Sequence, residues 1–400
     1  MIIVVSRSVI AAVMAVLVGV GLSRFAYSPL IPAIIEKAWL TPAEAVFLGA
    51  VNLAGYLIGA LGGRWSASLC STVAALRAFM LLASLSFMAS AFPHSYYWLF
   101  VWRLISGVSG GALMVLAAPT VLPRVPASRR GAASGVIFTG VGIGIVLSGT
   151  IIPVMLNYDL VLTWLVLGFL SLFATGLAWF WWPKGEVDVS DGAILANREL
   201  TSRYKSGLAA IYASYGFIAL GLVPHMVFLV DYIARGLSLG IVWGGRAWVF
   251  FGLGALLGPL IAGKMADSLG YGASIRCVLV IHFFSVGLLA FDHSNASLIF
   301  SSILVGSAVS GTVPLILGQI RERVSSLEEQ RVAWGFATAI FALGQAGGGY
   351  LYSYLFSLSN ESYSLVFLIG SFALVLSIIM NCLAPSADPK SPSRAASPRA

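Results

Sequence analysis

The chain has 400 residues, of which 59% are hydrophobic and 10% are charged, and its formal net charge is +8. This composition excludes an ordinary water-soluble protein and indicates that lipid is the solvent. Membrane topology accounts for the basic surplus, so we expect no nucleic-acid partner.

Twelve apolar segments follow one another along the chain, and each is long enough, or nearly so, to cross a hydrocarbon core of about 30 Å. They cover residues 8–35, 42–63, 72–92, 97–122, 132–155, 160–182, 208–234, 239–265, 273–291, 296–320, 332–357 and 363–383. The first is too long for a secretory signal and lacks a small-residue cleavage site, so we interpret it as an uncleaved span.

The Lys and Arg residues divide unevenly between the two sets of connecting segments. Eighteen lie in the set that includes both chain ends, and only Lys37 and Arg235 lie in the other set. The positive-inside rule therefore predicts a multi-pass protein of the bacterial cytoplasmic (inner) membrane, with both termini in the cytoplasm. Cys70, Cys277 and Cys382 then fall near the reducing side, so we expect no disulfide framework, no metal site and no cofactor.

The first apolar segment contains Gly19–Ile35, which reads GVGLSRFAYSPLIPAII. Arg24 places a full positive charge about 4 Å from the midpoint of this span. Because a charge in hydrocarbon is costly, Arg24 should face the protein interior and have a partner or a task. Pro29 and Pro32 interrupt the same segment by leaving backbone carbonyls without donors. A charged and interrupted first span indicates a substrate pathway.

Three more basic side chains lie within spans and are displaced toward the same outward side. His225 lies about 6 Å, and Arg103 and Arg246 about 10 Å, from the midpoints of their spans, whereas the nearest acid, Asp231, lies about 15 Å away from its own. A cavity with several basic groups and no central carboxylate is expected to prefer anions. Alternatively, Arg103 and Arg246 extend to the membrane interface or pair with Asp159 or Asp231, and His225 is a neutral packing residue.

Neutral polar side chains supply candidate contacts that would orient a ligand. Asn52 and Tyr56 lie one helical turn apart, and Gln345 lies near the middle of the eleventh segment. Hydrogen bonding between helices explains these residues equally well. The predicted substrate-binding residues are Arg24, Tyr27, Asn52, Tyr56, His225, Arg246 and Gln345.

The longest polar interruption divides the twelve segments into two sets of six. A shift of 200 residues brings three glycines of the fifth segment onto three of the eleventh, namely Gly135, Gly144 and Gly149 onto Gly335, Gly344 and Gly349. This agreement favours a duplicated six-helix unit. We predict an N-terminal six-helix bundle at 1–182, a cytoplasmic linker at 183–207, a C-terminal six-helix bundle at 208–384 and a disordered cytoplasmic tail at 385–400.

Two motifs resemble those of the major facilitator superfamily (MFS). GKMADSLG at 263–270 is similar to the G-xxx-D-xx-G signature of its cytoplasmic loops, and RLISGVSG at 103–110 is similar to its R-xx-x-G pattern in the fourth span. SRFAYSPLIP, followed by GAVNLAGYLIGAL, resembles the YbfB/YjiJ branch of the superfamily. The resemblance implies an all-α integral membrane protein with twelve transmembrane helices in two pseudo-symmetric six-helix bundles.

The resemblance also implies roles for residues of both motifs. In many members the arginine of the fourth span is tied to proton coupling, and the aspartate of the loop signature holds the cytoplasmic side closed. The equivalent loop of the first half, GALGGRWSASLC, has no acid, and the fifth segment lacks the Gly-Pro pair of drug/proton antiporters. The predicted gating or coupling residues are Arg103, Gly107, Gly263, Asp267, Gly270 and Asp231.

The leading hypothesis is a secondary active transporter that moves a small organic anion by rocker-switch alternating access. A proton on His225 or Asp231, a counter-ion, or uniport remain open as coupling modes. The alternative is a proton-coupled multidrug or metabolite efflux pump, which would ordinarily need a buried carboxylate. A membrane enzyme or sensor is disfavoured because no catalytic cluster or soluble domain is present in the sequence. We expect a monomer whose partners are the lipid bilayer and a small-molecule substrate.

Overall fold

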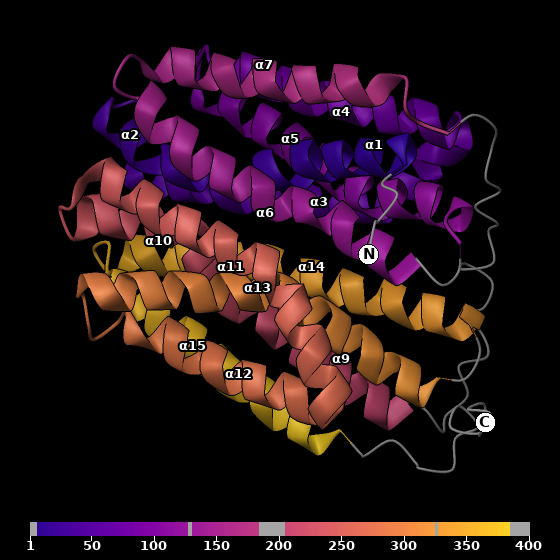
Figure 1. Ribbon diagram of the computed structural model, residues 1–400. Coiled ribbons are helices and arrows are strands. Elements are labelled where there is room, and N and C mark those ends of the chain that lie inside the picture. The colour runs from indigo at the N-terminus through magenta and orange to yellow at the C-terminus, as the bar shows by residue number, and fades with distance from the viewer. Residues whose placement is uncertain (1–5, 127–129, 184–204, 325–326, 385–400) are drawn as a thin grey trace, which may run out of the picture.

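The computed structural model describes residues 6–126, 130–183, 205–324 and 327–384, and its regular elements in these ranges are helices (Figure 1). The predicted tail at 385–400 and most of the predicted linker lie outside the described residues. The α-helices are α1 Arg7–Val16, α2 Ile31–Glu36, α3 Pro42–Leu69, α4 Thr72–Ser90, α5 Tyr96–Val121, α6 Arg130–Met155, α7 Leu160–Trp179, α9 Lys205–Val223, α10 Leu229–Asp231, α11 Gly240–Leu269, α12 Tyr271–Leu288, α13 Asn295–Arg323, α14 Leu327–Leu358 and α15 Tyr363–Leu383.

Ten helical stretches within the described ranges are long and apolar enough to cross a membrane. Of the twelve predicted segments, 8–35 and 332–357 are not among these ten. The former is divided into several short pieces, and the latter lies within the 32-residue α14. The membrane-spanning, all-helical character is therefore confirmed, and the number of twelve spans stays a prediction.

The first apolar segment changes its helical type three times. After α1 the chain forms a π-helix at Leu17–Leu22, a turn at 23–27, a 3₁₀ helix at Ser28–Leu30, and then α2. Pro29 and Pro32 lack the N–H groups that a continuous α-helix needs, which explains the 3₁₀ turn and the restart at Ile31. The interruption predicted from the two prolines is confirmed.

The seventh predicted segment is interrupted in a similar way. α9 ends at Val223 and gives way to a π-helix at Pro224–Phe228, then to α10, and then to a second π-helix at Tyr232–Gly236. π-helical turns often mark functional sites. We call residues 17–36 the first irregular stretch and residues 224–236 the second irregular stretch. The two stretches meet in the folded chain, because α10 contacts both α2 and the Ser28–Leu30 helix.

The helices before residue 184 pack mainly on one another, and so do those after residue 204. α3 packs against α5, α5 against α4, and α4 against α7, while α1 packs against α6 and α7. Later in the chain, α11 packs against α13, α13 against α12, α12 against α15, and α9 against α14 and α15. In Figure 1 the two sets, coloured indigo to magenta and orange to yellow, lie on opposite sides of the view.

Small residues allow close contact within the first set. A Cβ placed on Gly107 of α5 would lie 2.1 Å from the carbonyl oxygen of Asn52 in α3, and a Cβ on Gly59 would lie 2.0 Å from that of Val108. No side chain larger than hydrogen fits at either place. These glycines therefore set the distance between α3 and α5.

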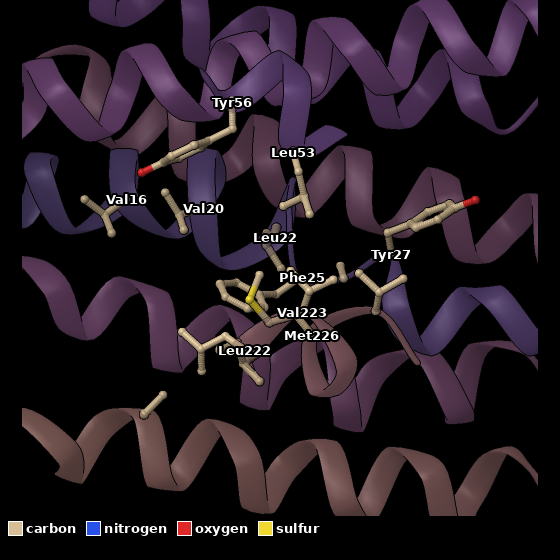
Figure 2. Packing of buried hydrophobic residues seen from close by; sticks show 14 of the residues in the cluster. Val16, Val20, Leu22, Phe25, Tyr27, Leu53, Tyr56, Leu222, Val223 and Met226 are labelled. Carbon is tan, nitrogen blue, oxygen red and sulfur yellow. The ribbon is translucent and has the colours of Figure 1, made fainter. Parts of the chain in front are cut away.

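The two sets meet through α6 with α11, through α3 with α14, and through the irregular stretches. Trp248 of α11 donates its indole N–H to the Ser148 hydroxyl of α6 at 3.1 Å, and its ring lies 6.2 Å from that of Phe25. Phe47 and Tyr350 face each other at 5.3 Å. Figure 2 shows Leu22, Phe25, Leu53, Leu222, Val223 and Met226 gathered where the two sets adjoin.

We call the end of the molecule that carries residues 37–41, 237–239 and 359–362 the distal end. In Figure 1 the labels α2 and α10 lie toward this end, and the labels α1 and α9 lie toward the opposite end. Four glycines toward that opposite end, Gly62, Gly135, Gly263 and Gly335, have open space within 4 Å of where a Cβ would lie.

Candidate functional site

Arg24 lies in the turn between the π-helix Leu17–Leu22 and the 3₁₀ helix, and its side chain is partly exposed. Its guanidinium donates from Nη2 to the amide oxygen of Gln345 on α14 and lies 3.9 Å from the sulfur of Met226. The same group lies 4.8 Å from the ring centre of Tyr56 and 5.4 Å from that of Phe25. Arg24 therefore connects the first irregular stretch with α3, α14 and the second irregular stretch.

The partners of Arg24 are neutral. In the described part of the chain, ion pairs join Arg235 to Asp231 and to Glu361, and none involves Arg24. Its Nε is buried without a hydrogen-bond partner. Two cation–π contacts and a neutral amide compensate the charge less fully than a carboxylate would. The guanidinium can therefore still bind an anionic group.

Gln345 and Met226 hold each other as well as Arg24. The Gln345 side chain is 2% exposed, and its Nε2 lies 3.5 Å from the Met226 sulfur. Met226 belongs to the π-helix Pro224–Phe228, whose backbone carbonyl at Met226 accepts the Ser28 hydroxyl of the first segment. The candidate site is thus built by residues from both sets of helices.

The carbonyl of Ser23, directly before Arg24, is held by three side chains. Arg103 Nη1 donates to it at 3.1 Å, Ser106 Oγ at 3.3 Å and Asn52 Nδ2 at 3.4 Å. A regular helix would supply the Tyr27 N–H instead, but that donor does not reach Ser23 among the described residues. We call these three donors the Ser23 clamp. The clamp fixes the backbone from which Arg24 projects.

Asn52 and Arg103 are thus placed differently from what the sequence analysis expected of a ligand contact. Asn52 is 1% exposed and also donates to the Arg103 carbonyl at 3.2 Å, so its amide bonds helices together. Arg103 is 2% exposed and lies 4.0 Å from the ring centre of Tyr27. Tyr27 in turn donates its hydroxyl to the Ala45 carbonyl at 2.8 Å. These three residues support the site from behind.

Tyr56, by contrast, lies directly at the candidate site. Its ring is under the Arg24 guanidinium, and its hydroxyl makes no hydrogen bond within the described ranges. Figure 2 shows its ring projecting beside Val16 and Val20 of the first segment. An aromatic face with a free hydroxyl can both stabilise the cation and bind a polar group of a ligand.

His225 is fully buried and faces away from Arg24, although it precedes Met226. Its Nε2 lies 2.7 Å from the Ser301 hydroxyl, which donates to the Ser285 carbonyl at 2.6 Å. Because that hydroxyl hydrogen is used, His225 must donate from Nε2. The ring packs edge-on against Phe367 at 5.3 Å. This arrangement matches the alternative of a neutral packing histidine.

Arg246 does not lie at the candidate site around Arg24. It is exposed and lies 5.2 Å from the ring centre of Trp243, its neighbour on α11. The acids considered as its partners are otherwise engaged. Asp159 caps α7 by accepting the Val161 N–H at 2.8 Å, and Asp231 pairs with Arg235.

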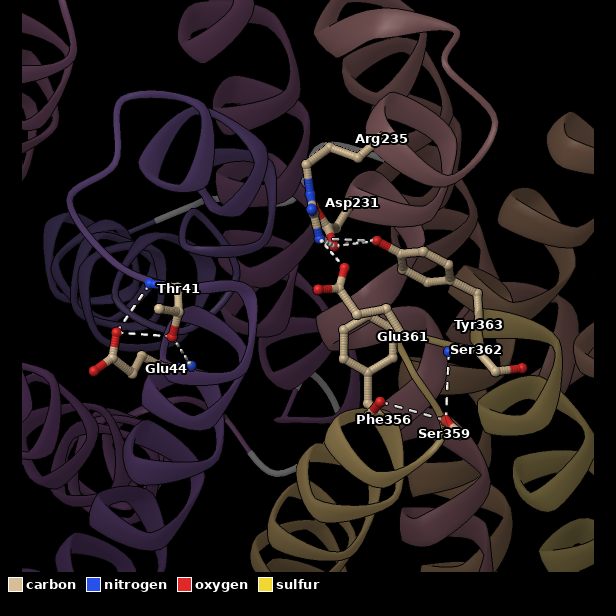
Figure 3. A network of polar contacts seen from close by, with 9 residues as sticks. All are labelled: Thr41, Glu44, Asp231, Arg235, Phe356, Ser359, Glu361, Ser362 and Tyr363. Carbon is tan, nitrogen blue, oxygen red and sulfur yellow. Dashed lines mark hydrogen bonds and ion pairs between the residues drawn. The ribbon is translucent and has the colours of Figure 1, made fainter.

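Asp231 is the centre of a polar network at the distal end (Figure 3). Its carboxylate accepts two bonds from Arg235, at 2.6 and 2.9 Å, and one from the Tyr363 hydroxyl at 2.6 Å. Arg235 also reaches Glu361 at 3.4 Å. The network joins the second irregular stretch to α15 and its preceding loop. The i,i+4 spacing of Asp231 and Arg235 could have revealed the pair in the sequence.

The loop motif lies at the end of α11 that is far from Arg24. Asp267 is exposed and has no ion pair or hydrogen bond within the described ranges. Gly270 adopts a φ of +78°, which favours glycine and lets α11 end before α12 begins. Gly263 has open space around it. The acid is therefore unengaged across the helix interface in this conformation.

Sequence reasoning missed Phe25, Ser28 and Met226. Phe25 and Met226 are apolar residues in apolar segments, and nothing in their spacing distinguishes them from core residues. Ser28 acts through a backbone carbonyl more than 190 residues away in the chain, so no local pattern reports it. Their roles follow from how the two irregular stretches meet.

A family model described as "Uncharacterised MFS-type transporter YbfB" matches residues 16–382. No match was found among curated proteins. The matched range includes every residue of the Arg24 site, the Ser23 clamp and the distal network. This chain therefore belongs to the YbfB-type family of major facilitator superfamily transporters.

Proposed function

We propose that the protein is a secondary transporter that moves a small organic anion across the cytoplasmic membrane by rocker-switch alternating access. The proposal includes twelve spans in two six-helix bundles, at 1–182 and 208–384, with both termini in the cytoplasm. The distal end is then the outward end. Family membership supports transport, and the Lys and Arg distribution supports the orientation.

The observation that carries the anion preference is the environment of Arg24. Its partners are a neutral amide, a thioether and two aromatic rings, and no described carboxylate compensates it. A buried or half-buried guanidinium gains most from a carboxylate, to which it can donate two parallel hydrogen bonds. An anion at this position would contact residues of both bundles.

Contacts with both bundles would let the ligand drive a conformational change. A ligand shifts an equilibrium only through different affinities for the two conformations. Arg24 and Tyr56 belong to the first bundle, whereas Gln345 and Met226 belong to the second. A rocking motion changes the distances between these pairs and hence the affinity. The unengaged Asp267 supports an inward-open conformation here.

The test is anion transport by the purified full-length protein in proteoliposomes. Vesicles loaded with benzoate or hexanoate and diluted into the radiolabelled acid should show counterflow, and Arg24→Gln should reduce its initial rate at least tenfold. Arg64→Gln removes an exposed arginine of α3 and serves as the control, with an unchanged rate expected. Counterflow by Arg24→Gln at the rate of the parent would contradict the proposal.

The same vesicles separate anion transport from efflux of cationic drugs. An efflux pump for cations ordinarily uses a buried carboxylate, and here the buried Asp231 is committed to Arg235 and Tyr363. Phenethylamine should therefore show no counterflow. Saturable amine exchange that survives Arg24→Gln would favour the efflux alternative over the anion carrier.

A further inference from the structure

We infer that the site takes monoanions with an apolar body, such as medium-chain or aromatic monocarboxylates, and discriminates against dicarboxylates. This inference rests on the proposed function and narrows its substrate class. It is carried by two observations about the surroundings of Arg24: the number of available cations and the chemistry of the adjoining side chains.

The first observation is that one cation is available where the two sets of helices meet. Arg103 is fully buried and committed to the Ser23 carbonyl and the Tyr27 ring. Arg246 is exposed beside Trp243, and Arg235 is paired with two acids at the distal end. His225 donates to Ser301 on the far side of its π-helix. Within the described ranges, Arg24 is the Arg or Lys side chain that lies where the two sets meet and has no anionic or backbone partner.

The second observation is that the neighbours of Arg24 are apolar. Phe25 and Tyr56 lie against the guanidinium, and Met226 touches it. Behind Phe25, Trp248 and Phe251 stack on each other at 4.9 Å with their planes 3° apart. Figure 2 shows that Leu22, Leu53, Leu222 and Val223 continue this apolar surrounding. Gln345 and the Tyr56 hydroxyl are the neutral polar groups beside the cation.

Together, the single available cation and its apolar neighbours favour a ligand with one negative charge. One carboxylate beside Arg24 forms a charge-assisted pair and replaces the Gln345 amide oxygen, which now accepts from the same Nη2. A second carboxylate would be moved from water to aromatic and aliphatic surroundings without a cation. An unpaired charge in such surroundings is strongly disfavoured. The apolar body of a monocarboxylate, however, gains from burial against the same side chains.

Gln345 offers a sharper variant than removal of the arginine. Gln345→Glu keeps the side-chain shape and places a carboxylate against Arg24. The protein would then supply its own single anion to its single cation. We expect this variant to stay folded and to lose monocarboxylate binding at least tenfold.

The experiment measures thermal unfolding of the detergent-purified, full-length protein against acids of matched skeleton. Hexanoate is compared with adipate, and benzoate with terephthalate; hexanamide and benzamide are the uncharged controls. At pH 7 the monocarboxylates should raise the unfolding temperature at concentrations at least tenfold below those at which the dicarboxylates do. Near pH 4.5 dicarboxylates are partly singly charged, so the discrimination should narrow.

The outcomes separate this inference from the proposed function. If dicarboxylates act at the same or lower concentrations, and Arg24→Gln abolishes their effect, the anion site stands and the monoanion inference is overturned. Unreduced monocarboxylate binding by Gln345→Glu would also overturn it, because a second cation would then be needed. If no acid of either kind acts, or if Arg24→Gln binds as the parent does, the proposed function fails as well.

Discussion

At the scale of single residues, the fold uses the guanidinium groups of Arg24 and Arg103 in different ways. Arg24 faces the junction of the two sets, whereas Arg103 is buried behind it with a carbonyl and an aromatic ring as partners. Arg103 Nε has no hydrogen-bond partner, and no described carboxylate pairs with it. A buried cation of this kind contributes little to stability, so we expect Arg103 to matter for transport and not for folding.

We therefore predict that Arg103→Met leaves the unfolding temperature unchanged or raises it, because an uncompensated buried charge is removed. Anion counterflow should nevertheless fall at least tenfold, since the Ser23 clamp loses its shortest donor. Thermal unfolding and counterflow are measured on the same preparation. A fall of both quantities in parallel would contradict this prediction and make Arg103 a purely structural residue.

The distal network gives a residue-scale prediction about stability. Asp231 is fully buried and accepts three hydrogen bonds, so Asp231→Asn should cost about 1–3 kcal/mol by leaving Arg235 and Tyr363 badly paired. Glu361 is 43% exposed, and its contact with Arg235 is 3.4 Å, so Glu361→Gln should cost at most about 0.5 kcal/mol. Denaturant titration of both variants checks the order. Equal losses would mean that Asp231 is not the centre of the network.

At the scale of elements, the sequence allowed the positions of the long helices and the interruption of the first segment to be predicted. A proline lacks a backbone N–H wherever it occurs, so Pro29 and Pro32 predict the interruption from the sequence alone. The π-helix Leu17–Leu22 and the Ser23 clamp could not be predicted, because Asn52, Arg103 and Ser106 come from helices that are distant in sequence. The depth of a basic residue in its predicted span also did not decide whether the residue lies at the candidate site. Arg246 and His225 lie within spans, but rotation about the helix axis turns them away from Arg24.

The contact between α3 and α5 gives a prediction with a matched control in the same helix. Gly59→Ala places a methyl group 2.0 Å from the Val108 carbonyl, so α3 and α5 must separate and the protein should lose at least about 1–3 kcal/mol. Gly62→Ala meets nothing within 4 Å and should be neutral or stabilising by up to about 1 kcal/mol. Thermal unfolding of both variants is compared. A Gly59→Ala protein as stable as the parent would show that the helices are not in close contact.

At the scale of the whole molecule, orientation in the membrane can be tested with the natural cysteines. All three are exposed, and Cys70 lies at the end of α3 away from the distal end. With Cys277 and Cys382 replaced by serine, a membrane-impermeant maleimide should label Cys70 in inverted vesicles and leave it unlabelled in intact spheroplasts. His94→Cys, in the loop before α5, in a background without other cysteines should give the opposite pattern. Labelling of Cys70 from outside would reverse the proposed topology.

The π-helix Leu17–Leu22 has a consequence for insertions and deletions in this chain. Such a turn accommodates one residue more than an α-helical turn of the same rise. Deleting a single residue there would restore regular α-helical winding and leave the later side chains of the first segment on their present faces, because the π turn already accommodates that residue. Inserting a further residue would instead rotate those side chains by about 100° around the axis. Arg24 would then point at a different neighbour, while the hydropathy of the segment stayed nearly the same. A one-residue insertion at this position should therefore abolish transport without preventing insertion into the membrane, whereas a one-residue deletion there, or an equal insertion in the loop before α5, should be tolerated.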